Sequence, residues 1–149
     1  MVSKKDIWFF ALTGAILSLN GIFSPFIAVI SPIGDHIEWL WGLQKAPSIF
    51  FSVVPFLLIM AVLLIVFTFV TLIFSFIARK RESLKVMGII WLICGIGTLV
   101  TIFLPIGYYI RYYHVSFADI LRGLFFGFYF PLISGILEIN AGIFGIIFE

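Results

Sequence analysis

The chain has 149 residues, of which 63% are hydrophobic and only 11% are charged. Soluble domains are usually about 45–50% apolar and about 25% charged, and a chain this short has too little interior to hide the excess. The composition, with a mean hydropathy of +1.26, excludes a soluble globular domain, a disordered chain and a nucleic-acid-binding protein. It predicts an integral membrane protein in contact with the lipid bilayer.

Apolar runs predict four membrane-spanning helices, at about 7–30, 46–78, 86–110 and 117–148. Each run is long enough for a helix that needs about 20 residues to cross the hydrocarbon core. The first run is also too long for a cleavable signal sequence, so we expect it to be retained. The second run exceeds one crossing, which predicts a tilted or protruding helix kinked at Pro55. We expect a single all-α domain over residues 1–149, an up-down-up-down bundle.

The distribution of Lys and Arg predicts the orientation of these spans. One side would hold six basic residues: Lys4, Lys5, Arg79, Lys80, Arg81 and Lys85. The other side would hold three: Lys45, Arg111 and Arg122. Because cytoplasmic loops carry the excess of basic residues, we expect a protein of the cell membrane with both termini in the cytoplasm.

Both outer loops contain helix-capping patterns and aromatic residues. Asp35 with Glu38 three positions later predicts a short interfacial helix in the first outer loop. Ser116 with Asp119 marks the start of the fourth helix in the same way. Aromatic side chains of this kind favour the headgroup region, and we expect four interfacial residues: Trp39, Trp41, Tyr112 and Tyr113.

Glu138 is the only ionisable side chain deep inside a predicted span. At 1.5 Å per residue it would lie roughly 16 Å from the inner edge, near the middle of a core about 30 Å thick. An acid at that depth costs on the order of 2.5–3.5 kcal/mol, so we expect Glu138 to be neutral or paired. Two roles stay open, an interhelical hydrogen bond and a proton or cation site.

Polar and small residues on the spans suggest what surrounds Glu138. Asn20, Thr68 and Thr98 lie at comparable depth and could form a polar layer with it. We favour backbone hydrogen bonds for the threonines and a partner role for Asn20. Small residues on one helix face let a second helix approach closely in lipid, which predicts helix packing at two sets of positions: Gly14, Ser18 and Gly21, and Gly135, Gly142 and Gly145.

The sequence contains no catalytic constellation and no metal or cofactor motif, and its single cysteine, Cys94, cannot form an internal disulfide. Four spans with Trp39 and Trp41-Gly42-Leu43 in a longer first outer loop are similar in layout to claudin-like tetraspan proteins. That family carries a cysteine pair in this loop, which the chain lacks, so we do not assign it to the family.

These features predict a non-catalytic protein and not an enzyme. The favoured hypothesis is an accessory or scaffold subunit that packs against other membrane proteins in a homo- or hetero-oligomer, since the small faces suit helix association. The alternative is a small oligomeric transporter or channel, coupled to protons or cations, in which Glu138 is the coupling site.

Overall fold

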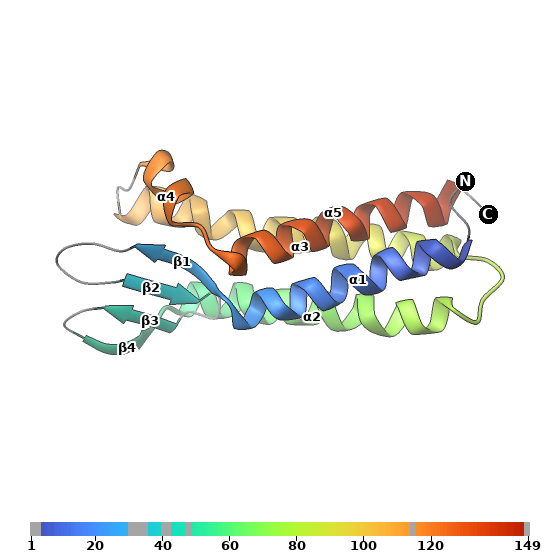
Figure 1. The fold of residues 1–149 in the computed structure, drawn as a ribbon, viewed down its shortest axis with the longest axis horizontal. Coiled ribbons are helices and arrows are strands. Elements are labelled where there is room, and N and C mark those ends of the chain that lie inside the picture. The colour runs from blue at the N-terminus through green and yellow to red at the C-terminus, as the bar shows by residue number, and fades with distance from the viewer. Residues whose placement is uncertain (1–3, 30–35, 40–42, 47–48, 114–115, 148–149) are drawn as a thin grey trace.

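The computed structural model describes residues 4–29, 36–39, 43–46, 49–113 and 116–147. Four long helices dominate it: α1 (Lys4–Phe23), α2 (Pro55–Ala78), α3 (Lys85–Tyr113) and α5 (Phe126–Ile147). Each long helix packs against two others, since α1 and α3 both contact α2 and α5. The start of α1, the end of α5 and the α2–α3 connection lie at one end of the bundle, here called the loop end (Figure 1). A small sheet and the short helix α4 (Phe117–Gly123) lie at the other, the sheet end.

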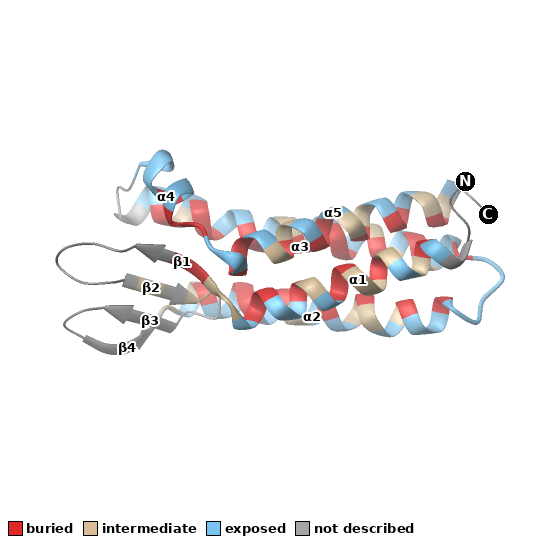
Figure 2. Ribbon diagram, in the orientation of Figure 1, coloured by how far each residue is buried: buried red, intermediate tan, exposed pale blue. Residues whose placement is uncertain are grey.

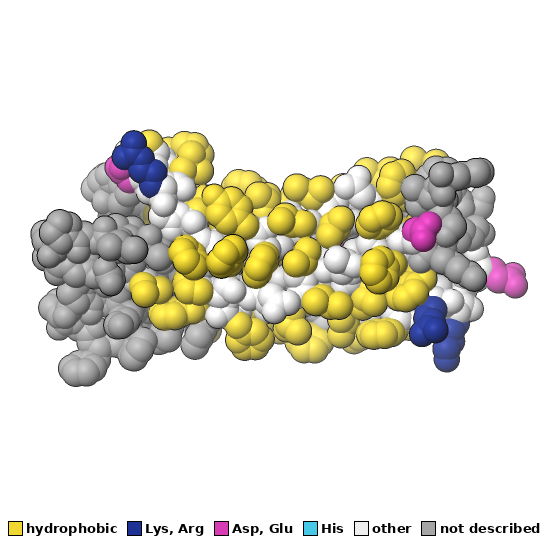
Figure 3. Space-filling view, viewed as in Figure 1, with side chains coloured by type: hydrophobic (Ala, Val, Ile, Leu, Met, Phe, Trp, Pro, Cys, Tyr) yellow, Lys and Arg dark blue, Asp and Glu magenta, His cyan; other side chains and the backbone are white. Residues whose placement is uncertain are grey.

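The prediction of a helical chain with four apolar helices is confirmed. The stretches long and apolar enough to cross a membrane are Asp6–Phe23, Pro55–Ala78, Lys85–Arg111 and Phe126–Ile147. Their exposed surfaces are rich in Phe, Ile, Leu and Val. Figure 3 shows these hydrophobic side chains along the middle of the molecule, with the coloured charged side chains near its ends. A surface of this kind is stable only against an apolar solvent such as lipid.

The segment between α1 and α2, the predicted first outer loop, forms a sheet, and the prediction of a short interfacial helix there is wrong. Its strands are β1 (Pro25–Val29), β2 (His36–Trp39), β3 (Leu43–Ala46) and β4 (Ile49–Val53), paired antiparallel in chain order. The aromatic and β-branched residues that flank the capping pattern favour strands, and pairing between strands outweighs a local cap. Trp39 therefore ends a strand, while Trp41 lies outside the described residues.

Two prolines mark helix boundaries at the sheet end. Hydropathy alone places these boundaries wrongly. The first helix ends at Phe23, because Pro25 lacks an N–H and holds the residue before it in an extended conformation. Pro55 does not kink a long second helix as predicted. It is instead the first residue of α2, where its missing N–H costs nothing. The apolar residues that follow Pro25, in β1, and those that precede Pro55, in β4, belong to the sheet.

The fourth predicted span is two helices. Ser116 caps α4 by accepting a hydrogen bond from the Asp119 N–H, as its sequence pattern predicted. The chain then leaves helical geometry at Leu124, which bridges Ile27 of β1. The Phe125 N–H donates to the Phe26 carbonyl at 3.0 Å. These contacts join the sheet to the start of α5.

Two apolar clusters fill the two ends of the bundle, and Figure 2 shows buried positions recurring along all four long helices. The sheet-end cluster includes Ile22, Leu57, Leu64, Ile102 and Phe128. The loop-end cluster consists of Ile7, Ala11, Ala78, Leu84, Trp91 and Ala141. Because lipid tails are as apolar as these side chains, close van der Waals packing within the clusters is what would hold the helices together in a bilayer.

Candidate functional site

A belt of buried polar side chains crosses the bundle between the two apolar clusters. All four long helices contribute to it, and each member is at most 3% exposed. We call this set the polar belt: Ser18 on α1, Thr68, Thr71 and Ser75 on α2, Thr98 and Thr101 on α3, and Ser134 and Glu138 on α5. The expectation of a polar layer through the bundle therefore corresponds to a real cluster, although its membership differs from the predicted one.

The polar belt is short compared with a membrane. On α2 it runs from Thr68 to Ser75, which is about 10 Å at 1.5 Å per residue. Leu64 of the sheet-end cluster precedes it on this helix, and Ala78 of the loop-end cluster follows it. On α2 the belt therefore covers about a third of the length that a helix needs to cross a hydrocarbon core about 30 Å thick.

Glu138 lies fully buried at the centre of the belt. Ser134, one helical turn earlier on α5, donates its hydroxyl to Glu138 Oε1 at 3.1 Å. Thr98 of α3 donates to Glu138 Oε2 at a longer 3.5 Å. On the α1 side, a Cβ atom at Gly14 would stand only 3.1 Å from Glu138 Cγ. The small residue thus lets α1 close over the acid.

Thr71 completes the surroundings of Glu138 from α2. Its hydroxyl neighbours the Glu138 carboxyl group, yet Thr71 Oγ1 has no hydrogen-bond partner among the described residues. The Cys94 thiol of α3 lies beside both groups. Buried polar atoms almost always find a partner, so the unpartnered hydroxyl of Thr71, which can donate as well as accept, is an informative feature of the site.

Hydroxyl groups elsewhere in the belt divide between two kinds of partner. Thr68 donates to Ser18 at 2.8 Å and so joins α2 to α1. Ser75 and Thr101 instead donate to backbone carbonyls of their own helices. The expectation that the threonines bond only to their own backbone is therefore wrong for Thr68 and Thr98, which join helices.

Asn20 does not belong to the site, contrary to the prediction that it would be a partner of Glu138. It is exposed on α1, and its amide donates to the Ile16 carbonyl at 2.9 Å. Asn140 of α5 bonds in the same way to the Ile136 carbonyl. A short amide side chain can satisfy itself on its own helix, so depth along the span was a poor guide to the direction of the side chain.

The predicted small faces are used inside the chain. A Cβ atom at Gly142 would lie 2.7 Å from the Leu92 backbone nitrogen. One at Gly135 would meet the Leu99 side chain, and one at Gly145 would lie 3.1 Å from Gly88 Cα. On α1, Gly21 packs against Pro131 of α5. The glycines of α5 therefore let that helix approach α3 closely, and the glycines of α1 let α1 approach α5 closely.

Sequence reasoning missed the glycines of α3 that receive α5, namely Gly88 and Gly95. A Cβ atom at Gly95 would lie 2.8 Å from the Gly135 carbonyl oxygen. Their seven-residue spacing matches that of Gly135 and Gly142, and places each pair on one helix face. Comparing these spacings between helices would have revealed the pairing.

The remaining predicted interfacial residues lie away from the polar belt. Tyr112 and Tyr113 are the last residues of α3. Among the residues that the structure describes, no group of three or more His, Cys, Asp or Glu side chains could hold a metal ion.

Two properties decide what this site can do chemically. No basic side chain in the described part of the chain pairs with Glu138, and an unpaired buried charge is costly. A protonated Glu138 has one O–H to donate, and Thr71 Oγ1 is the neighbouring acceptor without a partner. The arrangement suits a neutral acid that ties helices together, or a site that takes up and releases a proton.

No family model, curated protein or solved structure matches this chain. The polar belt, the packing around it and the surface of the bundle are therefore the features that bear on its function.

Proposed function

We propose that the four long helices cross the cell membrane as an up-down-up-down bundle with both termini in the cytoplasm. The loop end carries Arg79, Lys80, Arg81 and Lys85, together with the start of α1. The excess of basic residues on this side supports a cytoplasmic position. The sheet and α4 would then lie at the outer surface.

Within that membrane placement, we propose that the protein is a non-catalytic accessory or scaffold subunit. The observation that carries this proposal is the position of Glu138, fully buried in a belt bounded by apolar clusters at both ends. Carrying a solute across would require polar surface reaching both faces of the membrane. The interior instead suits a set of buried hydrogen bonds that holds the four helices in one fixed arrangement.

The surface available to partners follows from the same packing. The small-residue faces contact helices of the same chain, so they give no support to docking of a second subunit. The partners proposed here would contact the exposed apolar side chains of the helices or the sheet. The sheet could serve as such a contact surface, because Phe26 and Ile27 of β1 tie it to Phe125 and Leu124, which connect α4 to α5.

Glu138 also supports a second candidate function, coupling to protons or cations. An intramembrane acid is a functional candidate in its own right, and the free acceptor at Thr71 gives a proton somewhere to bond. This function requires a second conformation in which one apolar cluster opens. In an oligomer, each chain would hold its own acid, since Glu138 is enclosed by helices of its own chain.

One pair of measurements separates the two functions. Extraction in a mild detergent, followed by native mass spectrometry, tests for co-purifying subunits. Reconstitution into proteoliposomes tests for proton or cation flux, with Glu138→Gln as the matched variant. Stable partners without flux would support the scaffold function. A flux in the wild type that Glu138→Gln abolishes, while the variant remains folded, would replace it with the transporter.

A further inference from the structure

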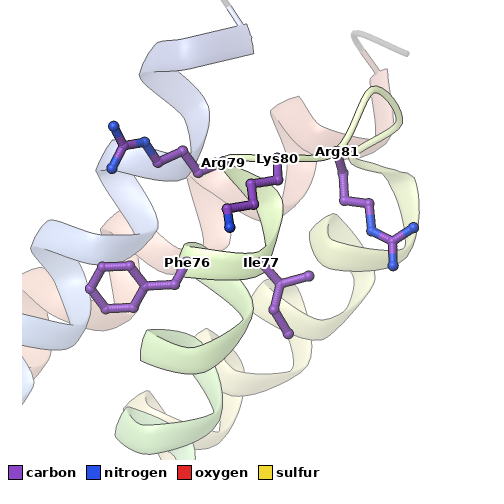
Figure 4. Close-up of a pocket in the computed structure, with 5 residues that line it drawn as sticks. All are labelled: Phe76, Ile77, Arg79, Lys80 and Arg81. Atoms are coloured by element: carbon purple, nitrogen blue, oxygen red, sulfur yellow. The ribbon is translucent and has the colours of Figure 1, made fainter.

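Three consecutive basic residues follow the last turn of α2 at the loop end. Arg79, Lys80 and Arg81 are exposed, and so are Phe76 and Ile77 just before them. Together these five residues line an open pocket of about 630 Å³. In Figure 4 the Lys80 and Arg81 side chains run back toward the level of Phe76 and Ile77. Cationic groups and apolar groups thus share one pocket at the predicted edge of the membrane.

The cations of this pocket are available to an anion. Neither Lys80 nor Arg81 forms an ion pair within the described part of the chain. Arg79 extends over α1, where its guanidinium lies 5.9 Å from the centre of the Trp8 ring. A cation–π contact of this kind orients the guanidinium without neutralising its charge. In Figure 4, Arg79 and Arg81 point to opposite sides of Lys80, so the three charges line the rim of the pocket.

An apolar track leads away from the pocket along α2. Phe69, Ile73 and Phe76 recur at helical spacing, and each is more than half exposed. An acyl chain laid along this track would contact hydrophobic side chains over about two turns, or roughly 10 Å. A molecule with an anionic head and an apolar tail fits both parts of the surface, whereas a free anion uses only the first.

We propose that this pocket binds the headgroup of an anionic phospholipid, with one acyl chain lying along Phe69, Ile73 and Phe76. The phosphate would accept hydrogen bonds from Lys80 and Arg81, the donors that suit its oxygens. The inference rests on the membrane placement proposed above. Among its described residues the sheet end has no run of adjacent basic residues, since Arg111 and Arg122 lie on different helices and Arg122 pairs with Asp119 at 3.7 Å.

Binding of defined lipids to the purified full chain tests this site. The delipidated protein, held in a mild detergent, is titrated with phosphatidylglycerol, with phosphatidylcholine of the same acyl chains, and with inorganic phosphate. Native mass spectrometry counts bound lipid, and thermal unfolding follows stabilisation. We expect selective binding of phosphatidylglycerol and a higher unfolding temperature. Equal binding of the two lipids would overturn the proposal, and an equal effect of inorganic phosphate would reduce the pocket to a simple anion site.

Charge-neutralising variants locate the binding. Lys80→Gln combined with Arg81→Gln should weaken phosphatidylglycerol binding by roughly thirty-fold, because each basic residue at a membrane surface contributes about 1 kcal/mol. Arg111→Gln removes a charge near the sheet end and should leave binding unchanged. Equal losses in both variants would show an effect of net charge alone and would overturn the site. Partition of the chain into vesicles is measured separately, so that a failure of the membrane placement is distinguishable.

Discussion

The contact between α3 and α5 predicts opposite effects of one substitution at two glycines. A Cβ atom at Gly142 would stand 2.7 Å from the Leu92 backbone nitrogen and 2.8 Å from the Gly88 carbonyl oxygen. Both atoms belong to the backbone of α3, so no side chain can rotate away. At Gly107, also on α3, an added Cβ atom would meet nothing within 4 Å.

The two substitutions should therefore change the free energy of unfolding in opposite directions. Overpacking costs about 1–3 kcal/mol, while replacing a helical glycine by alanine returns roughly 0.5–1 kcal/mol. Gly142→Ala should then lower the free energy of unfolding by up to about 2.5 kcal/mol. Gly107→Ala should leave it unchanged or raise it by up to about 1 kcal/mol. Pairing the two variants controls for the change in intrinsic helix propensity.

Unfolding by sodium dodecyl sulfate in mixed micelles measures both free energies, with helical circular dichroism as the signal. Gly95→Ala repeats the test from the other helix, since its Cβ atom would lie 2.8 Å from the Gly135 carbonyl oxygen. If Gly142→Ala proves as stable as Gly107→Ala, the close approach of α3 to α5 is refuted.

Further predictions concern the belt, the α4 cap and the orientation. Glu138→Gln should unfold at nearly the wild-type detergent concentration, because the amide keeps a donor and an acceptor, whereas Glu138→Leu should lose about 1–3 kcal/mol through unsatisfied hydroxyls. Thr71→Val should cost about 0.6–1.7 kcal/mol if it accepts the Glu138 proton, and a neutral effect in the same unfolding assay would contradict that bond. Ser116→Ala should cost about 0.5–2 kcal/mol by removing the α4 cap, which hydrogen exchange of α4 would detect. In a Cys94→Ser background, an impermeant thiol reagent should label a cysteine at position 36 and spare one at 80, and the reverse pattern would invert the orientation.

Hydropathy predicted the helices well wherever charged residues bound them. At the loop end, Ala78 is the last apolar residue before Arg79, and α2 ends there. At the sheet end, no charged residue separates helix from strand. The first apolar run continues through Pro25, and the second begins at Ala46 and continues past Pro55. Strands and helices can both be apolar throughout, so composition could not separate them. Pro25 and Pro55 carried the missing information, because each stands where the chain changes between helix and strand, whereas Pro105 and Pro131 lie inside helices.

The candidate site was predictable in its centre but not in its partners. The depth of Glu138 and the small residues on its face indicated a buried acid in a protein contact, and the structure places it in one. Which side chains meet it depends on the rotation of each helix about its axis. Thr71 and Asn20 both lie on spans, yet one faces the acid and the other is exposed. A sequence position fixes depth, whereas rotation is set by contacts between helices.

The central place of α5 has a consequence for how the protein is made. It packs more extensively on α1 and α3 than any other helices pack on each other, and the ribosome delivers it after both of them. Until it arrives, the glycine grooves of α1 and α3 and the hydroxyl of Thr98 have no partner from α5. In the membrane placement proposed above, the three earlier helices would therefore remain in the bilayer with these polar and glycine-lined surfaces unpaired. A chain whose synthesis stalls before α5 would expose these unpaired surfaces to chaperones and membrane proteases.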